Sequence, residues 1–394
     1  MRNVGTVVRG IRTPIIKQGD DLVEIVVSSL LNASISSGFE FNDRDIVGIT
    51  EAVVSICDSN YVTIDDISAE IEEKYGNEEI GLVFPILSRN RFSMILQSVL
   101  KVCRKVHILF SYPADEVGNH ILNPEMLYSP TAKEYPSSFG EKEFREIFGY
   151  DFKHEFTGLD YVEYYKSLGK KGQVVVHFSN DPKYILEFTK SVLVCDIHTR
   201  VITKALIKGA GATVVHGLDD ICSRKVKNRG YNLEYGLLGS NKVGDEKLKL
   251  FPRKEMSMEL VCEVQKRIKD ITGKLIEVMV YGDGAFKDPV GGIWELADPV
   301  VSPAFTEGLL GRPKEIKLKY ISETWDGKGD IDKYVRSTIS KKRTDEYNEE
   351  KSLGTTPRQL TDLLGSLMDL TSGSGDKGTP VVLVQGYFDD YTVK

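Results

Sequence analysis

Val174-Val-Val-His-Phe178 opens the most regular part of the sequence, in which short β-branched runs alternate with segments of helical spacing. The runs Val192-Leu-Val-Cys195 and Thr213-Val-Val215 follow, and segments 182–190 and 200–208 lie between the three runs. Strands that alternate with helices pair in parallel, and the carboxyl ends of such strands line a crevice. This part of the chain therefore predicts a parallel βαβ patch.

Outward from this patch, strands and helices follow one another less regularly, and residues 112–172 combine several prolines with many aromatics. We interpret 112–172 either as a lid or as an insertion that thickens the fold. The remaining expected elements are strands at 4–8, 45–50, 106–110, 275–280, 315–320 and 381–384, and helices at 22–37, 64–75, 89–104, 254–272 and 357–370. We predict an α+β fold with mixed β-sheets and packed helices.

Composition narrows the class of protein. The chain has 394 residues, and 51 Lys and Arg against 58 Asp and Glu leave a net charge of −7, which argues against a nucleic-acid binder. Its apolar runs are far shorter than the roughly 20 residues of a membrane helix. The five cysteines are odd in number and form no CxxC pair, a pattern typical of reduced thiols. We expect a cytoplasmic protein with no membrane or nucleic-acid partner.

Asp283 is the first candidate for metal chemistry, because it lies in a Gly-Asp-Gly sequence after an apolar strand. A carboxylate there suits Mg²⁺ or Mn²⁺ beside a phosphate. The alternative, a tight turn, is favoured by the local sequence alone.

Asp196 and His198 form a second candidate pair at the end of an expected strand. They could share a metal or act as base and electrophile, although a helix cap beside a half-exposed histidine is the favoured interpretation. Cys195 has the pattern of an inert core thiol. The glycine-rich loop 372–378 could wrap a phosphate with its backbone N–H groups or serve as a flexible linker.

Five segments, in order, resemble the coenzyme F-420 γ-glutamyl ligases. The opening Val8-Arg-Gly-Ile11 and Pro14-Ile-Ile-Lys-Gln-Gly-Asp-Asp21 is similar to the family's V-x-G-[LI]-P-x-[IV]-x-x-G-D-D, with Arg12 and Thr13 as two extra residues. The other four segments are Asp45 to Ser55, Gly236-Leu-Leu-Gly-Ser-Asn241, Ile271 to Phe286, and Gly378 to Gly386.

The resemblance implies site residues position by position. The nucleotide would lie against Gly10, Ile11 and Pro14, with Thr50, Glu51 and Asn241 nearby, and the loop containing Gly375 and Gly378 would close on the phosphates. Asp283 would bind the metal with Asp376 or Asp369. Two positions depart from the family, since Ile56 replaces a lysine and Leu238 replaces an aspartate. Asp196, His198, Arg200 or Lys204 could replace the missing groups.

The function implied is that of a ligase dependent on GTP and on Mg²⁺ or Mn²⁺. It would join L-glutamate through a γ-glutamyl amide bond to a carboxylate acceptor, by way of an acyl phosphate. The alternatives are a folate-type acceptor or a non-catalytic nucleotide- or metabolite-binding homologue. The resemblance also implies a homodimer, and a ligase-like fold in which residues 1–60 and 225–394 enclose an insertion at 61–224.

Overall fold

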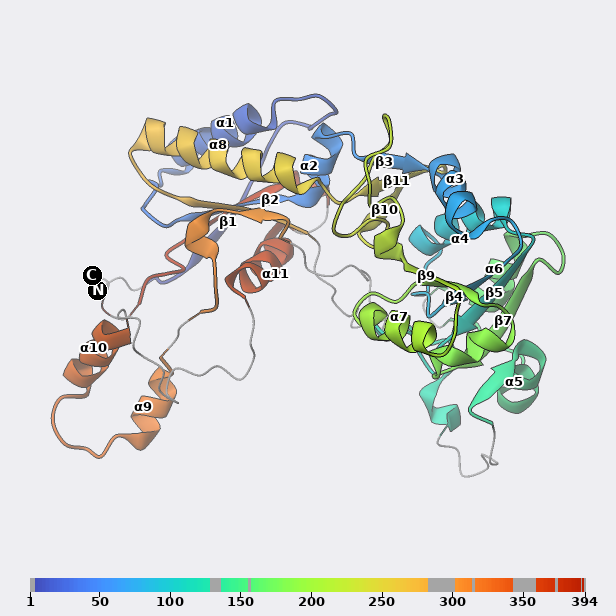
Figure 1. Cartoon of the computed structure of the whole chain (residues 1–394). Coiled ribbons are helices and arrows are strands. Elements are labelled where there is room, and N and C mark those ends of the chain that lie inside the picture. The colour runs from blue at the N-terminus through green and yellow to red at the C-terminus, as the bar shows by residue number, and fades with distance from the viewer. Residues whose placement is uncertain are drawn as a thin grey trace. The chain divides into compact units, whose positions relative to one another are not determined.

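The computed structural model describes residues 4–127, 136–154, 157–282, 302–313, 316–342, 359–372, 375–390 and 392. These residues form two compact units, one built from residues up to Cys57 and from Lys254 onward, the other from Asp58–Arg253 (Figure 1). The boundary at residue 224 that the sequence suggests lies inside the second unit. Asp283 lies outside the described residues.

A five-stranded mixed sheet forms the centre of the first unit. Its order is β1 (Val7–Ile11), β14 (Val381–Gln385), β2 (Ile46–Thr50), β12 (Glu277–Tyr281) and β13 (Ala304–Phe305). Only β2 and β12 pair in parallel, and the other neighbours are antiparallel. The two chain ends therefore meet in this sheet, because β14 lies between β1 and β2.

Helices cover both faces of this sheet. On one face, α1 (Leu22–Ser37) and α8 (Lys254–Thr272) contact each other over the buried side chains of β2, β12 and β14. On the other face, α11 (Leu360–Ser372) approaches so closely that a Cβ at Gly48 would lie 2.1 Å from the Met368 sulfur. Figure 1 shows the sheet between these two helical layers.

The α1 boundaries follow from its caps. Asp21 accepts a hydrogen bond from the Glu24 N–H at 3.0 Å, and Gly38 ends the helix at a φ of 65°, a conformation that glycine adopts readily.

The remaining described elements of the first unit are short. They are α2 (Glu51–Cys57), η4 (Glu307–Leu309), α9 (Leu318–Thr324), α10 (Ile331–Lys342) and η6 (Gly375–Lys377). The predicted strand at 315–320 is wrong, because the chain is helical from Leu318. Ile321 packs against Val335 and Ile339 of α10, and this burial on one helical face outweighs the alternating local pattern.

The second unit contains a six-stranded sheet in the order β6 (Ser138–Gly140), β7 (Val174–Ser179), β5 (Lys105–Phe110), β4 (Glu79–Val83), β8 (Ser191–Val194) and β9 (Val214–Gly217). All neighbours are parallel except β6 and β7. The predicted parallel arrangement of β7, β8 and β9 is confirmed, with β5 and β4 lying between β7 and β8.

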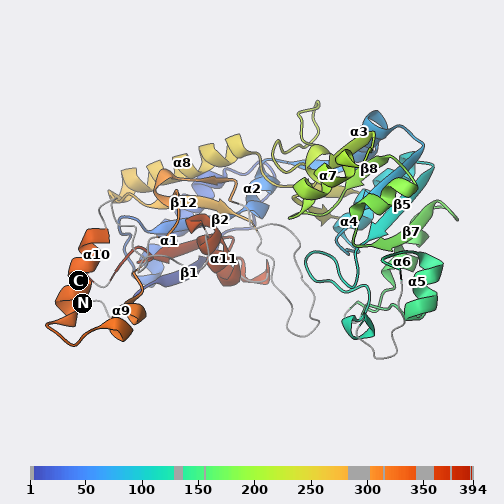
Figure 2. The same ribbon diagram turned by 60° about the horizontal axis from the view of Figure 1, so that its bottom comes forward.

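Helices, labelled in Figure 2, and a small antiparallel sheet, labelled in Figure 1, complete the second unit. The helices are α3 (Ile64–Tyr75), α4 (Arg91–Val102), α5 (Glu141–Phe148), α6 (Tyr161–Ser167) and α7 (Arg200–Gly209), with 3₁₀ turns η1 (Pro124–Leu127), η2 (Pro182–Glu187) and η3 (Leu218–Asp220). The small sheet has the order β10 (Ser240–Val243), β11 (Lys247–Leu250) and β3 (Tyr61–Thr63). Pairing of β11 with β3 joins residues 240–250 to this unit.

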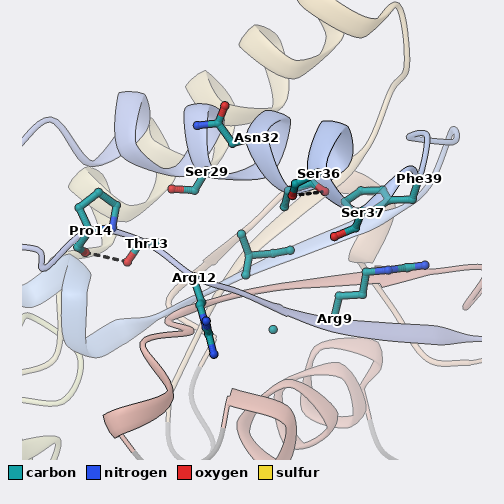
Figure 3. Close-up of a pocket in the computed structure, with 12 residues that line it drawn as sticks. Arg9, Arg12, Thr13, Pro14, Ser29, Asn32, Ser36, Ser37 and Phe39 are labelled. Atoms are coloured by element: carbon teal, nitrogen blue, oxygen red, sulfur yellow. Dashed lines mark hydrogen bonds between the residues drawn. The ribbon is translucent and has the colours of Figure 1, made fainter.

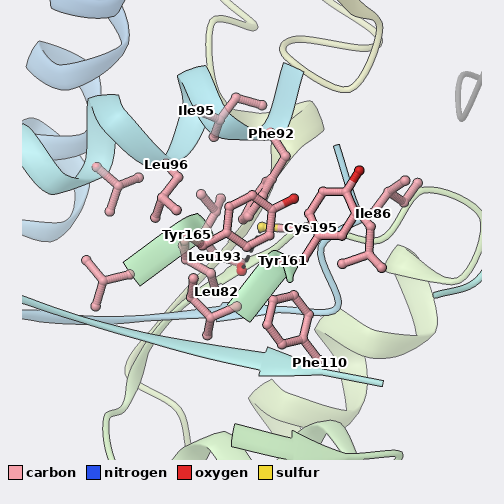
Figure 4. Packing of buried hydrophobic residues seen from close by; sticks show 14 of the residues in the cluster. Leu82, Ile86, Phe92, Ile95, Leu96, Phe110, Tyr161, Tyr165, Leu193 and Cys195 are labelled. Atoms are coloured by element: carbon pink, nitrogen blue, oxygen red, sulfur yellow. Dashed lines mark hydrogen bonds between the residues drawn. The ribbon is translucent and has the colours of Figure 1, made fainter. Parts of the chain in front are cut away.

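The described part of 112–172 is packed into the core. Phe139, Phe144, Tyr161 and Tyr165 are buried, and the Tyr165 hydroxyl donates to the Ser88 carbonyl at 3.0 Å. Figure 4 shows Tyr161 and Tyr165 among the side chains of α4 and the sheet. These aromatic side chains fill the space over the sheet and belong to the core of the second unit. No described helix combines the length and apolar character needed to cross a membrane.

Candidate functional site

Four strand ends meet at one edge of the five-stranded sheet. Ile11 at the end of β1 pairs with Val381 at the start of β14, and Thr50 at the end of β2 pairs with Tyr281 at the end of β12. Val381 also pairs with Ile49. Loops that leave these strands are therefore brought together by the sheet register.

Backbone contacts link the loops at this edge. The Thr13 N–H donates to the Gly378 carbonyl at 3.1 Å, and the Thr50 N–H donates to the Pro380 carbonyl at 2.9 Å. A Cβ at Gly10 would lie 3.0 Å from Cβ of Thr379, so the chain approaches closely there. The fold thus brings Gly10 and Ile11 of β1 and Thr50 of β2 together with the loop that carries Gly378, although these residues are distant in sequence.

A pocket of about 810 Å³ lies between the end of β1 and helix α1 (Figure 3). Predicted residues Gly10, Ile11 and Pro14 line it. The other lining residues are Arg9, Arg12, Thr13, Ser29, Asn32, Ala33, Ser36, Ser37 and Phe39. Two guanidinium groups, several hydroxyls, one amide and an aromatic ring give the lining a basic, hydrogen-bonding character without a carboxylate.

The two arginines of the pocket differ in how they are held. Nη1 of Arg9 donates to Oε1 of Gln385 at 2.6 Å, and its guanidinium lies 4.8 Å from the centre of the Phe39 ring. Arg12 is exposed, and no hydrogen bond or ion pair joins its guanidinium to another described residue. Arg12 is therefore available to an anionic ligand, whereas Arg9 is already oriented by its neighbours.

Glu51 is the first residue of α2 and directly follows β2. Only 1% of the residue is exposed, and its Oε2 accepts a hydrogen bond from the Ser55 hydroxyl at 3.3 Å. A carboxylate in the first turn interacts favourably with the helix dipole. Glu51 is thus held in place immediately after Thr50, at the same edge as the pocket loops.

The predicted metal ligands are only partly described. Asp376 is exposed in η6, which begins at Gly375 and leads into β14, while Asp369 is partly buried in the last turn of α11. Within the described ranges, no group of three or more His, Cys, Asp or Glu is arranged to hold a metal ion. The metal assignment, with Asp283 outside those ranges, stays a prediction.

Comparison with known protein families identifies the family of this chain. A family model described as F420-0:Gamma-glutamyl ligase matches residues 10–386, nearly the whole chain. The chain belongs to the F420-0:gamma-glutamyl ligase family. Membership supports a γ-glutamyl ligase of the F420-0 type. A search of curated proteins gives no match.

Arg9 and Arg12 are pocket residues of this F420-0:gamma-glutamyl ligase family member that the sequence analysis did not assign. Both flank the predicted Gly10 and Ile11, and Arg12 is one of the two residues that are extra relative to the family motif. Arg12 was therefore already visible in the sequence as a positively charged residue inserted into the family motif. Its meaning depended on the α1 residues Ser29 and Asn32, which only folding places opposite β1.

The segment similar to the family's G-[IL]-D-x-S-N lies in the second unit. Asn241 is partly buried in β10, and Leu238 is fully buried in the hydrophobic core. A Cβ at Gly239 would lie 1.8 Å from the Phe251 ring, so packing alone requires this glycine. Leu238 therefore serves the core of this family member and supplies no carboxylate.

Two of the four groups that could replace the missing carboxylate and lysine already have ion-pair partners. Arg200 and Lys204 bind the Asp219 carboxylate at 2.9 and 3.1 Å. Asp196 is buried, while His198 is exposed. Burial raises the pKa of the Cys195 thiol far above its ordinary value, in agreement with an inert core residue.

Proposed function

We propose that this protein is a ligase that uses GTP and Mg²⁺ or Mn²⁺ to join L-glutamate, through an amide bond, to a carboxylate acceptor. The observation that carries the proposal is the pocket at the sheet edge, because it is lined by Gly10, Ile11 and Pro14 in a chain that belongs to the F420-0:gamma-glutamyl ligase family.

The lining chemistry suits a nucleotide. Arg9 and Arg12 supply positive charge for phosphates, and hydroxyls such as those of Ser29 and Ser36 offer hydrogen bonds for a sugar or base. Phe39 and Pro14 add apolar surface. A volume of about 810 Å³ lies within the range of ordinary small-molecule sites.

Asp283 together with Asp376 or Asp369 would hold the divalent metal, because hard cations prefer carboxylate oxygens. The fit rests on placement: Asp376 precedes β14 in the same loop as Gly378, whose carbonyl accepts from Thr13 at the pocket. When bound, the metal neutralises phosphate charge.

In the proposed reaction, a carboxylate oxygen of the acceptor attacks the γ-phosphorus of GTP, and GDP leaves. The amine of L-glutamate then attacks the acyl carbon of the resulting acyl phosphate, inorganic phosphate leaves, and the amine loses a proton. Positioning and charge stabilisation dominate such phosphoryl transfers. Arg12 would bind anionic oxygens, and Arg9, oriented by Gln385 and Phe39, would define the pocket wall.

Phosphate release from GTP is the direct test, measured with Mn²⁺, L-glutamate and a panel of acceptors that includes a folate and the deazaflavin precursor of coenzyme F-420, the acceptor that the family resemblance implies. Release that requires both glutamate and one acceptor supports the ligase and identifies its acceptor. If the protein binds GTP but hydrolyses it with none of the acceptors, it is the non-catalytic homologue. Ile56 and Leu238 suggest this alternative, because they replace a lysine and an aspartate of the family. The predicted homodimer is tested separately by the mass of the protein in solution.

Replacing Arg12 by Ala is expected to raise the KM for GTP about tenfold to a hundredfold, with a smaller change in kcat. The reason is that a charge-assisted hydrogen bond contributes about 1.5 to 3 kcal/mol. Steady-state kinetics with GTP as the varied substrate give the measurement. Arg312→Ala is the matched control, because Arg312 is an exposed arginine of the same unit and does not line the pocket. Equal KM values for the two variants would remove Arg12 from the nucleotide site.

A further inference from the structure

The six-stranded sheet of the second unit has a reversal of strand order between β4 and β8. In chain order β5 and β7 follow β4 on one side, while β8 and β9 lie on the other side. The loops that leave the carboxyl ends of β4 and β8 lead to α4 and α7. In open parallel sheets, the crevice at such a reversal is the usual place for a ligand.

A carboxylate from another loop occupies the beginning of α7. Glu116, in the segment after β5, accepts hydrogen bonds from the backbone N–H groups of Ile197, His198 and Thr199, the last two at 3.1 and 3.3 Å. The Thr199 hydroxyl oxygen lies 3.3 Å from Glu116 Oε2, but it donates its single hydrogen to Asp196 Oδ2, which is closer at 2.6 Å. Thr199 makes no side-chain cap of its own. Three backbone donors therefore converge on one anion, which here is supplied by the chain itself.

Asp196 provides an independent indication of a ligand at the same place. Only 1% of this residue is exposed, and its Oδ2 accepts from the hydroxyls of Thr199 and Thr203 at 2.6 and 2.7 Å. Its Oδ1 is buried and has no hydrogen-bond partner among the described residues. Because the Thr199 hydroxyl contacts both carboxylates, Asp196 lies directly beside Glu116.

Two adjacent carboxylates are an unfavourable arrangement. Burial raises the pKa of Asp196, and repulsion from Glu116 raises it further. A buried acceptor without a donor is destabilising. A ligand that brought a positively charged donor to Asp196 and its own anion to the start of α7 would relieve both costs.

We propose that the start of α7 binds an amino acid, whose carboxylate replaces that of Glu116 there and whose ammonium group donates to Asp196 Oδ1. Glu116 is exposed and can turn outward, while the neighbouring Asp115 holds the loop backbone through the N–H groups of Leu87 and Asn119 at 2.9 and 2.8 Å. Glu116 thereby acts as an internal competitor. The proposal does not depend on the ligase function, since its residues all belong to the second unit.

Calorimetric titration of the full chain with L-glutamate tests the proposal. Glu116→Ala is expected to tighten binding at least about tenfold, because a tethered competitor has an effective concentration in the millimolar range. Glu125→Ala is the matched control, an exposed glutamate in η1, and should bind as the unaltered protein does. Adding Asp196→Asn to Glu116→Ala should weaken binding about tenfold, since a charged acceptor is lost.

Glutarate and inorganic phosphate separate an amino-acid site from a general anion site. Binding of L-glutamate at least about tenfold tighter than either probe supports the proposal, whereas equal binding of all three overturns it. Absence of binding to Glu116→Ala also overturns it and leaves Glu116 as a helix cap. Thermal unfolding shows whether Glu116→Ala is folded. If it is not, Glu116→Gln takes its place in the titration.

Arg12→Ala distinguishes this site from the proposed ligase pocket. If the heat of L-glutamate binding is unchanged in Arg12→Ala but altered in Glu116→Ala, the binding site lies in the second unit. If the heat of L-glutamate binding is lost only in Arg12→Ala, the binding site lies in the first unit and the inference is overturned. Failure of GTP turnover has no bearing on either result, so the two proposals can fail separately.

Discussion

Asp283→Asn is expected to reduce GTP-dependent ligation by about a hundredfold to a thousandfold and to weaken Mn²⁺ binding in parallel. Asp283 follows the last residue of β12 by two positions, and β12 ends beside Thr50 at the edge where the pocket loops meet. Loss of one carboxylate from a metal that neutralises phosphate charge removes several kcal/mol, and each 1.36 kcal/mol corresponds to tenfold in rate. Turnover and Mn²⁺ titration are measured on the same preparations.

Asp326→Asn is the matched control for this prediction. Asp326 lies between α9 and α10, where its carboxylate accepts from the Lys328 N–H at 3.0 Å, and its loss should leave turnover unchanged. Reduced turnover in Asp283→Asn with unaltered Mn²⁺ affinity would show that Asp283 is not a metal ligand. The same titration on Asp369→Asn and Asp376→Asn decides which of these two carboxylates accompanies it.

The second unit is expected to lose up to about 3 kcal/mol of stability as the pH falls from 6.5 toward 4. His177 of β7 and His107 of β5 are 5% and 3% exposed, and their ring nitrogens Nε2 and Nδ1 lie 3.0 Å apart. Burial, then repulsion from His107 and Lys105, lowers the pKa of His177 to about 4. Burial also lowers the pKa of His107, against the opposing effect of Glu79.

The loss of stability on acidification follows from the lowered pKa values of His177 and His107. The fold favours the neutral rings, so their contribution is complete above pH 6.5 and is lost as the unfolded chain takes up protons that the folded chain excludes. Asp115 acts in the opposite direction, because burial raises its pKa to about 6 and the fold then favours its protonated form. The histidine contribution must therefore be isolated by comparing variants.

Urea unfolding of His177→Asn at pH 7.5, 6.0 and 5.0 provides that comparison. This variant removes the titrating ring from its stacked position on Phe188 and should show a smaller loss of stability on acidification, although it starts less stable at pH 7.5. His198→Gln, which changes an exposed histidine, should retain the full acid loss. The same decrease between pH 7.5 and 5.0 in all three proteins would contradict the assignment to the buried pair.

Local sequence predicted those helices whose ends carry their own signals. The range 64–75 matches α3, which Thr63 and Asp66 open with a capping box, and 254–272 matches α8, which Gly273 follows. Such caps act within one turn, so they can be read without knowledge of the fold. The strand predicted at 315–320 failed because Ile321 is buried against α10, a partner that the local pattern does not contain.

The candidate site was predictable only in part. The motif residues Gly10, Ile11 and Pro14 were assigned from sequence and line one pocket, whereas Arg9 and Arg12 were not assigned although they line it too. An exposed arginine in a sequence is normally a solvated charge. It becomes informative only when the serines of α1 are placed opposite it.

By itself, the sequence determined the family, the α+β class and the boundaries of well-capped helices, because these depend on motifs, periodicity and contacts within a few residues. Only the tertiary structure decided that β14 lies between β1 and β2, so that residues near 10, 50 and 380 share one edge. It also decided that Glu116 caps α7 across 81 positions of the chain. Register between distant strands and burial against distant side chains fix these contacts, and neither is written in any local segment.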